Sequence, residues 1–145
     1  MKKSIVFSLV VFFSVIFNVQ SQSVLGKWKT IDDETGQAKS IVEIYEKSGK
    51  IYGKIVEIVN PEKRKSLCAK CSGDDKNAPI LGLIIIKGLV KDGDEYEGGK
   101  ILDPNTGRMY SLAAKLSNNG QRLHLRGYVG VSALGRSQIW IRVNN

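Results

Sequence analysis

The sequence has little histidine and little cysteine, and both shortages limit the chemistry available to it. Its 145 residues include a single His, at position 124, and two Cys. A single imidazole excludes any site that needs two histidines from one chain, and two cysteines exclude a four-cysteine zinc site or a disulfide-dense miniprotein. Because so few catalytic groups are available, we expect a protein that is not an enzyme and that carries no cofactor and no metal.

Acidic residues are also in the minority. The chain has 22 Lys and Arg against 14 Asp and Glu, a formal net charge of +8, and 42% of its residues are hydrophobic. The length and composition are those of one globular domain. A positive chain can bind nucleic acid, but no basic-aromatic motif of a known nucleic-acid module is present. We therefore expect no nucleic-acid partner, and expect any electrostatic partner to be an anionic component of the cell envelope.

Long apolar runs are absent except at the N terminus. Lys2 and Lys3 precede an apolar run from Ile5 to Phe17, which is too short to span a bilayer comfortably. Val19 and Ser21 then fit the small-x-small pattern of a signal-peptidase site. We expect residues 1–21 to be a signal peptide cleaved after Ser21, the alternative being an uncleaved anchor. Residues 22–145 would then form a single exported domain, periplasmic or secreted, without a transmembrane segment.

The remaining chain contains no long segment with the periodicity of an amphipathic helix. Short segments rich in β-branched and aromatic residues alternate instead with turn signals such as Ser48-Gly49 and Asp92-Gly93. The expected strands are Gly26–Ile31, Ser40–Tyr45, Lys50–Val59, Leu81–Val90, Glu95–Leu102, Arg108–Leu116, Arg122–Val131 and Arg136–Val143. This pattern predicts an all-β, antiparallel up-and-down meander of about eight strands. Such a meander loses its edge strands by closing into a small barrel, with an open sheet or a sandwich as the alternative.

A polar loop from Pro61 to Pro79 interrupts the pattern and is long for a compact domain, which indicates a functional or mobile segment. It contains Cys68 and Cys71. Two cysteines at this spacing can form a structural disulfide, a redox couple or half of a metal site, or can stay as free thiols. We expect a disulfide that staples the loop. An exported protein meets an oxidising compartment, and the loop lacks the helix N-terminus that usually activates a redox thiol.

The last two expected strands offer a candidate ligand site. Each strand has a polar-aromatic face and a more apolar face. If the polar-aromatic faces point inward, they line a cavity for an anionic, partly apolar ligand. That cavity would be lined by Arg126, Tyr128, Gln138 and Trp140. We prefer the alternative in which the other faces form the core, through Leu123, Leu125, Ile139 and Ile141.

Six short strings distributed along the chain carry a family resemblance. They are Gly26-Lys27-Trp28, Tyr52-Gly53-Lys54-Ile55, Pro79-Ile80-Leu81-Gly82-Leu83, Gly99-Lys100-Ile101-Leu102-Asp103-Pro104, Arg126-Gly127-Tyr128-Val129-Gly130 and the segment from Gly135-Arg136 to Trp140 and Arg142. Together they resemble the DUF2147 family of exported bacterial proteins, from about Leu25 to Val143. That family is a domain of unknown function, so the resemblance implies export and supplies no catalytic residue.

Gly26 and Trp28 also form a Gly-x-Trp string that is similar to the opening of lipocalin-like barrels. In those barrels an Arg from the end of the chain covers the indole, and Arg142 could do so here. The resemblance implies that Trp28 and Arg142 close the barrel floor, a contact that contributes about 0.5–2 kcal/mol. It also implies binding of a small apolar or amphipathic ligand. The alternative is a structural or interaction module of the cell envelope that uses the basic loop from Glu62 to Lys76 and an exposed sheet face.

Overall fold

A computed structural model describes residues 14–16, 22–131 and 135–144. The expected signal peptide, residues 1–21, lies outside the described residues except for residues 14–16. In the described part of the chain, no helix is long and apolar enough to cross a membrane.

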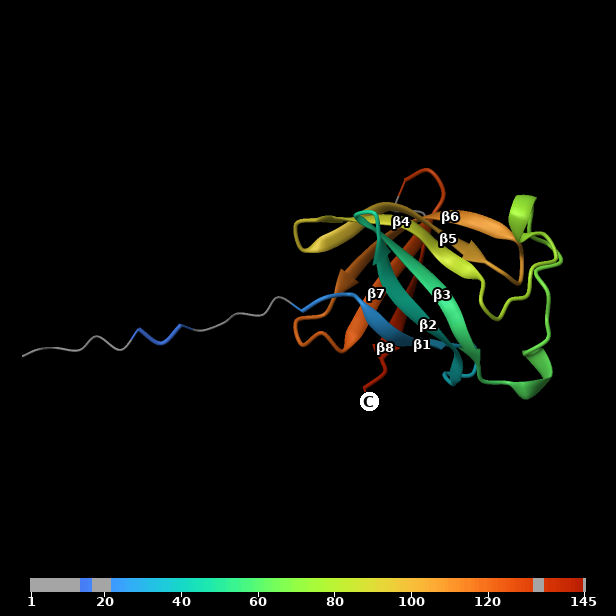
Figure 1. Ribbon diagram of the computed structural model, residues 1–145, viewed down its shortest axis with the longest axis horizontal. Helices are drawn as coiled ribbons and strands as arrows, with labels where there is room; N and C mark the ends of the chain where they lie inside the picture. The colour runs from blue at the N-terminus through green and yellow to red at the C-terminus, as the bar shows by residue number, and fades with distance from the viewer. Residues whose placement is uncertain (1–13, 17–21, 132–134, 145) are drawn as a thin grey trace, which may run out of the picture.

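Eight antiparallel strands close into a barrel in which each strand pairs with its neighbours in the sequence and β8 returns to β1 (Figure 1). The strands are β1 (Gly26–Ile31), β2 (Ala38–Lys47), β3 (Lys50–Ile58), β4 (Ile84–Asp92), β5 (Glu95–Asp103), β6 (Arg108–Leu116), β7 (Arg122–Tyr128) and β8 (Arg136–Arg142). The predicted all-β meander and its closure are thus confirmed. The closing seam is short, and pairs Trp28 with Arg142 and Lys29 with Ile141.

Most strand bounds differ somewhat from those expected, and β2, for example, covers Ala38–Lys47 rather than Ser40–Tyr45. The two largest shortenings are at the start of β4 and the end of β7. β4 begins at Ile84 rather than Leu81, and β7 ends at Tyr128 rather than Val131. The apolar residues at 81 and 83 flank Gly82, which has a φ of 93°, and Gly130 has a φ of 76°. Left-handed backbone at a glycine ends the extended conformation, so apolar side chains continue beyond the strands into the connections.

Side chains fill the barrel interior. The largest fully buried residues include Trp28, Ile44, Ile86, Leu112 and Leu123, which come from five different strands. Burying an aliphatic or aromatic side chain of this size contributes about 1.5–3 kcal/mol, so this core is the main source of stability. Trp140 is also buried, with 2% of its surface exposed.

The core of the last strand pair differs from the interpretation that we preferred. Leu123 and Leu125 are buried as expected, but Ile139 is 41% exposed and Ile141 is only partly buried. The register explains the difference, because Leu123 lies opposite Trp140, and residues directly opposite in a sheet share a face. β8 therefore turns its indole inward, which buries more apolar surface than either isoleucine would.

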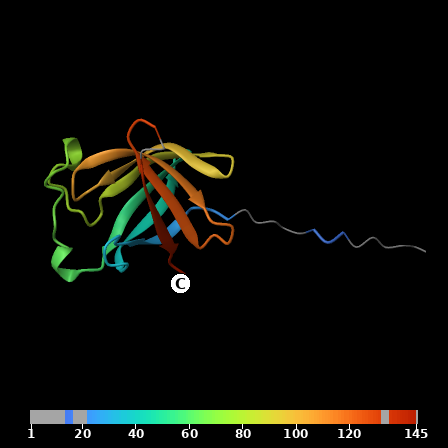
Figure 2. The same ribbon diagram turned by 180° about the vertical axis from the view of Figure 1, so that it is seen from behind.

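The two ends of the barrel are built differently. One end, the floor, holds the turns β2–β3, β4–β5 and β6–β7, where the strands are joined by two to five residues. The other end, the strap end, holds the connection from β3 to β4, which extends outward from the barrel (Figures 1 and 2). We call this connection, residues 59–83, the strap.

Candidate functional site

The strap folds back on itself as an irregular hairpin. It contains two short 3-10 helices, η1 (Pro61–Lys63) and η2 (Gly73–Asp75). Leu67 and Pro79 form an isolated antiparallel bridge, and the amide of Cys68 donates to Ala78 O at 2.8 Å. These cross-links give the long polar segment a defined shape without a strand or helix of ordinary length.

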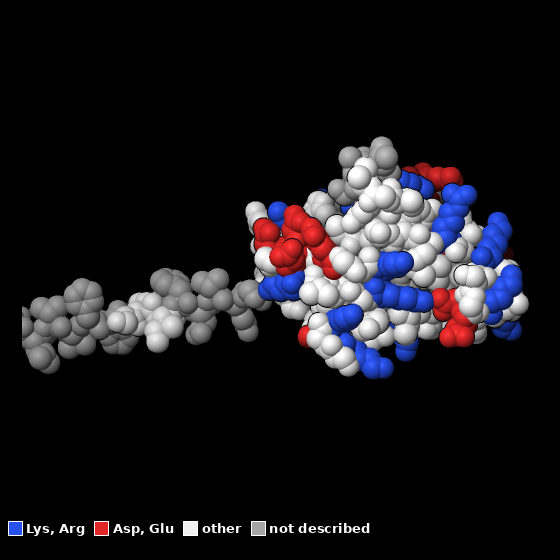
Figure 3. Space-filling view, turned by 90° about the horizontal axis from the view of Figure 1, so that it is seen from above, with Lys and Arg blue, Asp and Glu red and all other residues white. Residues whose placement is uncertain are grey.

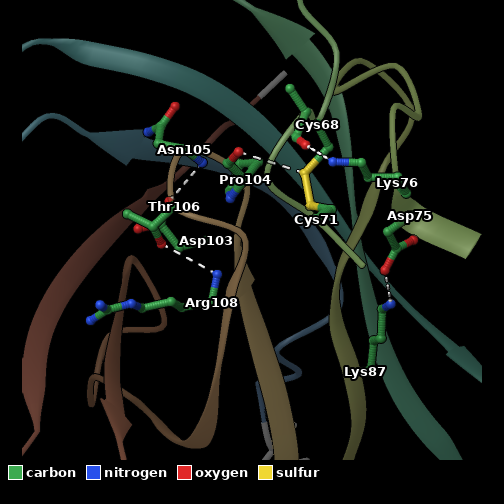
Figure 4. The surroundings of a disulfide bond; sticks show 11 residues. Cys68, Cys71, Asp75, Lys76, Lys87, Asp103, Pro104, Asn105, Thr106 and Arg108 are labelled. Atoms are coloured by element: carbon green, nitrogen blue, oxygen red, sulfur yellow. Dashed lines mark hydrogen bonds and ion pairs between the residues drawn. A yellow bond between two sulfur atoms is a disulfide. The ribbon is translucent and has the colours of Figure 1, made fainter. Parts of the chain in front are cut away.

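Cys68 and Cys71 form the predicted disulfide. Both residues are buried, with 0% and 3% of their surface exposed, and they belong to the apolar core cluster. Figure 4 shows the disulfide facing the β5–β6 turn, where Cys68 Sγ lies 3.6 Å from Pro104 O. The disulfide therefore closes the tip of the strap at the point where that tip contacts the barrel.

Gly107 makes the close contact between strap and barrel possible. A Cβ atom added to Gly107 would lie only 1.9 Å from Lys70 O and 2.9 Å from Cys71 N. Both neighbours are backbone atoms of the strap, so they cannot move aside without displacing the strap tip. Gly107 also has a φ of 71°, which a side chain strains.

A Gly107→Ala variant is therefore expected to release the strap while leaving the barrel folded. Hydrogen exchange of the amides in residues 61–80 should become at least about tenfold faster, since their local opening then costs less free energy. Gly93→Ala is the matched control, because Gly93 has a φ of 63° but no heavy atom within 4 Å of an added Cβ. Equal effects of the two variants on the strap would contradict this account.

A groove of about 380 Å³ lies between the strap and the outer surface of the barrel. Most of its lining is apolar, and Tyr52 of β3 contributes an aromatic ring. The lining residues are Tyr52, Asp75, Ala78, Pro79, Leu81, Gly82, Leu83, Ile84 and Lys87. The volume lies at the lower end of the range found for small-molecule sites, and the groove is open to solvent.

The groove has one charged element. Lys87 Nζ of β4 lies 2.6 Å from Asp75 Oδ2 of η2 (Figure 4), and the two side chains are 34% and 24% exposed. This ion pair joins the strap to the barrel wall. Within the cross-strand register, Lys87 lies directly opposite Lys100, which is exposed. The groove thus combines an apolar lining with an ion pair at one margin, and Lys100 adds a positive charge outside that lining.

A chain of hydrogen bonds leads from the barrel interior to the rim of the strap end. Trp140 Nε1 donates to Gln138 Oε1 at 3.2 Å, and Gln138 Nε2 donates to Asp33 Oδ2 at 3.3 Å. Arg136 also donates to Asp33 Oδ2, at 3.1 Å. Next to it, the backbone N–H groups of Thr35 and Glu34 bond to Asp32 and lower the pKa of that carboxyl.

The structure divides the four residues that were considered as one ligand site. Gln138 and Trp140 lie on the inner face of β8, in the chain of hydrogen bonds just described. Arg126 and Tyr128 lie on the outer face of β7, and Arg126 donates to Ser137 Oγ at 2.9 Å. The four side chains therefore do not line one cavity, because the register places the polar-aromatic faces of the two strands on opposite sides of the wall.

Trp28 and Arg142 meet at the floor. The guanidinium carbon of Arg142 lies 4.3 Å from the centroid of the Trp28 ring, and Trp28 Nε1 donates to Val24 O at 2.9 Å. Arg142 also donates to Gly120 O, Leu25 O and Ser23 O at 2.7, 3.0 and 2.6 Å. Burial lowers the pKa of the guanidinium. These contacts join the segment before β1, the β6–β7 turn and β8.

No group of three or more His, Cys, Asp or Glu residues suited to hold a metal occurs within residues 14–16, 22–131 and 135–144. Three features characterise the described part of the chain. They are a closed eight-stranded barrel with a filled interior, an Arg over a Trp at its floor, and a disulfide-anchored strap with a groove beneath it.

The chain belongs to the DUF2147 family, described as an uncharacterized protein conserved in bacteria, whose family model matches residues 26–142. A comparison with functionally curated proteins found no match. Among solved structures, the barrel is similar to protein HP1028 from the human pathogen Helicobacter pylori, which is described as belonging to the lipocalin family. The two share 21% sequence identity, with 86% of each chain covered and a TM-score of 0.75, so the likeness establishes a lipocalin-like fold.

Reasoning from the sequence missed the groove. It singled out residues 61–79 as a functional or mobile loop, but it assigned no role to Tyr52, Asp75 or Lys87. These residues come from β3, η2 and β4, and no spacing in the sequence indicates that they meet. The one available signal was the apolar stretch at residues 81–85, which is longer than its strand requires.

Proposed function

We propose that this protein binds a small amphipathic ligand in the groove beneath the strap. The observation that carries the proposal is the lining of that groove, which is apolar along Leu81 and Leu83 and carries the ion pair of Lys87 with Asp75 at one margin. Binding sites for small molecules are usually mostly apolar with a few polar groups that fix orientation. The barrel interior is a less suitable site, because large side chains occupy it.

The proposed binding takes place outside the cytoplasm. The apolar N-terminal segment supports export, as does the disulfide, since disulfides persist mainly in oxidising compartments. The family is found in bacteria, so the compartment we propose is the periplasm or the medium. In such an oxidising compartment the disulfide at the strap tip would stay formed and would help to keep the groove in shape.

Binding of 1-anilinonaphthalene-8-sulfonate, an amphipathic anion, tests the proposal directly. We expect saturable binding of about one molecule, which a Leu81→Asp substitution in the groove weakens at least about tenfold by introducing a charge into its apolar lining. Leu67→Asp is the matched control, because Leu67 also lies on the strap and is 51% exposed, compared with 41% for Leu81, but does not line the groove.

The two variants add the same charge to the same strap, so only position distinguishes them. If both weaken binding equally, or neither does, the groove is not the site. Native mass spectrometry of the protein, expressed from its full sequence and purified without detergent, gives a second test. A discrete added mass that Leu81→Asp removes and Leu67→Asp retains would identify a ligand held in the groove.

A further inference from the structure

Acidic residues are absent from half of the barrel wall. β6, β7, β8 and β1 contain no Asp or Glu, whereas each of β2, β3, β4 and β5 contains at least one. The four strands without acid are consecutive neighbours in the closed barrel. Within this group, no carboxylate on an adjacent strand offsets the positive side chains. Carboxylates on adjacent strands occur only at its two margins, where β1 pairs with β2 and where β6 pairs with β5.

The outward side chains of β7, β8 and β1 form a surface that we call the basic wall: Arg122, His124, Arg126, Ile139, Ile141 and Lys29. β7 and β8 occupy the side of the barrel presented in Figure 2. Cross-strand pairing places Arg122 beside Ile141, and Ile141 beside Lys29, in one row across three strands. His124 lies beside Ile139 in the next row. Basic residues and isoleucines thus alternate across the wall.

Lys29 and Arg122 are exposed and have no salt-bridge partner within the part of the chain that the structure describes. Lys87, Lys115 and Arg136, which lie outside the basic wall, each pair with a carboxylate. Arg126, within the basic wall, has partners of its own, among them Ser137 Oγ. The charges of Lys29 and Arg122 are accordingly available to an external anion.

Exposed aliphatic side chains accompany these charges. Ile139 is 41% exposed, and just beyond β7 the side chains of Val129 and Val131 are 68% and 61% exposed. All three lie on the β7–β8 hairpin. Binding to a soluble polyanion would not bury these aliphatic side chains. A bilayer could bury them, because it has hydrocarbon beneath a layer of charged headgroups.

One group of carboxylates lies across the barrel from the basic wall, whereas Asp33, at the strap end of β1, is already bonded to Arg136 and Gln138. Asp92, Asp94, Glu95 and Glu97 lie in and around the β4–β5 turn, and Figure 3 shows a cluster of acidic side chains at that end of the barrel. A hydrogen bond with Glu95 and burial raise the pKa of Glu97, as expected where carboxylates crowd together. The charge distribution is therefore asymmetric, and it would orient the basic wall toward an anionic surface.

We propose that the basic wall docks on a bilayer that contains anionic phospholipids. Lys29 and Arg122 contact the headgroups, and Ile139, Val129 and Val131 contact the acyl region near the interface. Each cation near such a surface strengthens binding, and added salt weakens the attraction because it shortens the distance over which the surface charge acts. The proposal is independent of the strap groove, which involves β3, β4 and the strap.

Sedimentation with lipid vesicles tests the proposal. The protein, expressed from its full sequence, should bind vesicles of phosphatidylglycerol and phosphatidylcholine more tightly than vesicles of phosphatidylcholine alone. We expect Lys29→Glu with Arg122→Glu to weaken binding to the anionic vesicles at least about tenfold. Lys50→Glu with Lys54→Glu on β3 is the matched control, since both residues are exposed and the change in net charge is the same.

Because both double variants keep the same N-terminal segment, any membrane affinity of that segment cancels in the comparison. Equal weakening by the two would mean that net charge alone drives binding, and would overturn the proposal.

An Ile139→Ser variant should weaken vesicle binding at least about threefold while leaving binding to dextran sulfate, a soluble polyanion, unchanged. An Ile139→Ser protein that binds vesicles normally would instead favour a polyanionic partner. Circular dichroism establishes that each variant is folded.

Discussion

An Arg142→Ala variant is expected to lose about 3 kcal/mol of unfolding free energy, measured by urea denaturation. The substitution removes three hydrogen bonds to the carbonyls of Ser23, Leu25 and Gly120, as well as the contact with Trp28. Hydrogen bonds from a charged donor are individually worth about 1.5–3 kcal/mol, but water can replace part of what an incompletely buried guanidinium supplies. The floor of the barrel would then lose the side chain that joins its three segments.

Two further substitutions separate the contribution of geometry from that of charge. Arg142→Lys keeps the charge, but one ammonium group cannot reach all three carbonyls, so an intermediate loss is expected. Arg122→Ala removes an exposed arginine on the neighbouring strand and should change stability by no more than about 0.5 kcal/mol. A loss below about 1 kcal/mol for Arg142→Ala would show that Arg142 merely covers the floor without stabilising it.

A Gly99→Ala variant should lose about 3 kcal/mol, because the interior has no room for even one methyl group at this position. An added Cβ would lie 2.7 Å from the backbone N of Leu89 and 2.9 Å from its Cα. Gly99 and Leu89 are buried on neighbouring strands, β5 and β4. Relief of the clash would separate two paired strands of the barrel, which costs more than a change of rotamer.

Gly127→Ala is the matched control for this effect. Gly127 also lies within a strand and has an ordinary φ, but an added Cβ there meets its nearest neighbour, Tyr110 Cβ, at 3.5 Å. Alanine at that position should be neutral or stabilise by up to about 1 kcal/mol, since it restricts the unfolded chain. Similar losses for the two variants would indicate that strand propensity, rather than space, determines the cost.

Local chemistry explains why so much of the fold could be predicted from the sequence. Ser48-Gly49 and Asp92-Gly93 mark tight turns because Gly49 and Gly93 adopt positive φ at low cost, and both join consecutive strands as expected. The disulfide was predictable for a similar reason, because two cysteines three positions apart in a loop can meet without long-range folding.

The faces of β7 and β8 were harder to predict. β7 buries its leucines, as alternation indicates, whereas β8 buries Trp140 and exposes Ile139. Within each strand alternation offers two choices, and the register between the strands selects the combination. That register depends on the whole barrel closing, with Arg142 of β8 reaching Trp28 of β1.

By itself the sequence determined the all-β meander, its turns, the disulfide and the family, because these depend on the backbone preferences of short segments and on strings of adjacent residues. Only the tertiary structure decided which faces point inward, that side chains fill the interior, and that a groove forms where Tyr52, Leu81 and Lys87 meet. It also brought β1 against β8, which joins the strands without acid into one continuous surface. Such features join residues distant in the chain, and closure of the barrel and docking of the strap bring them together.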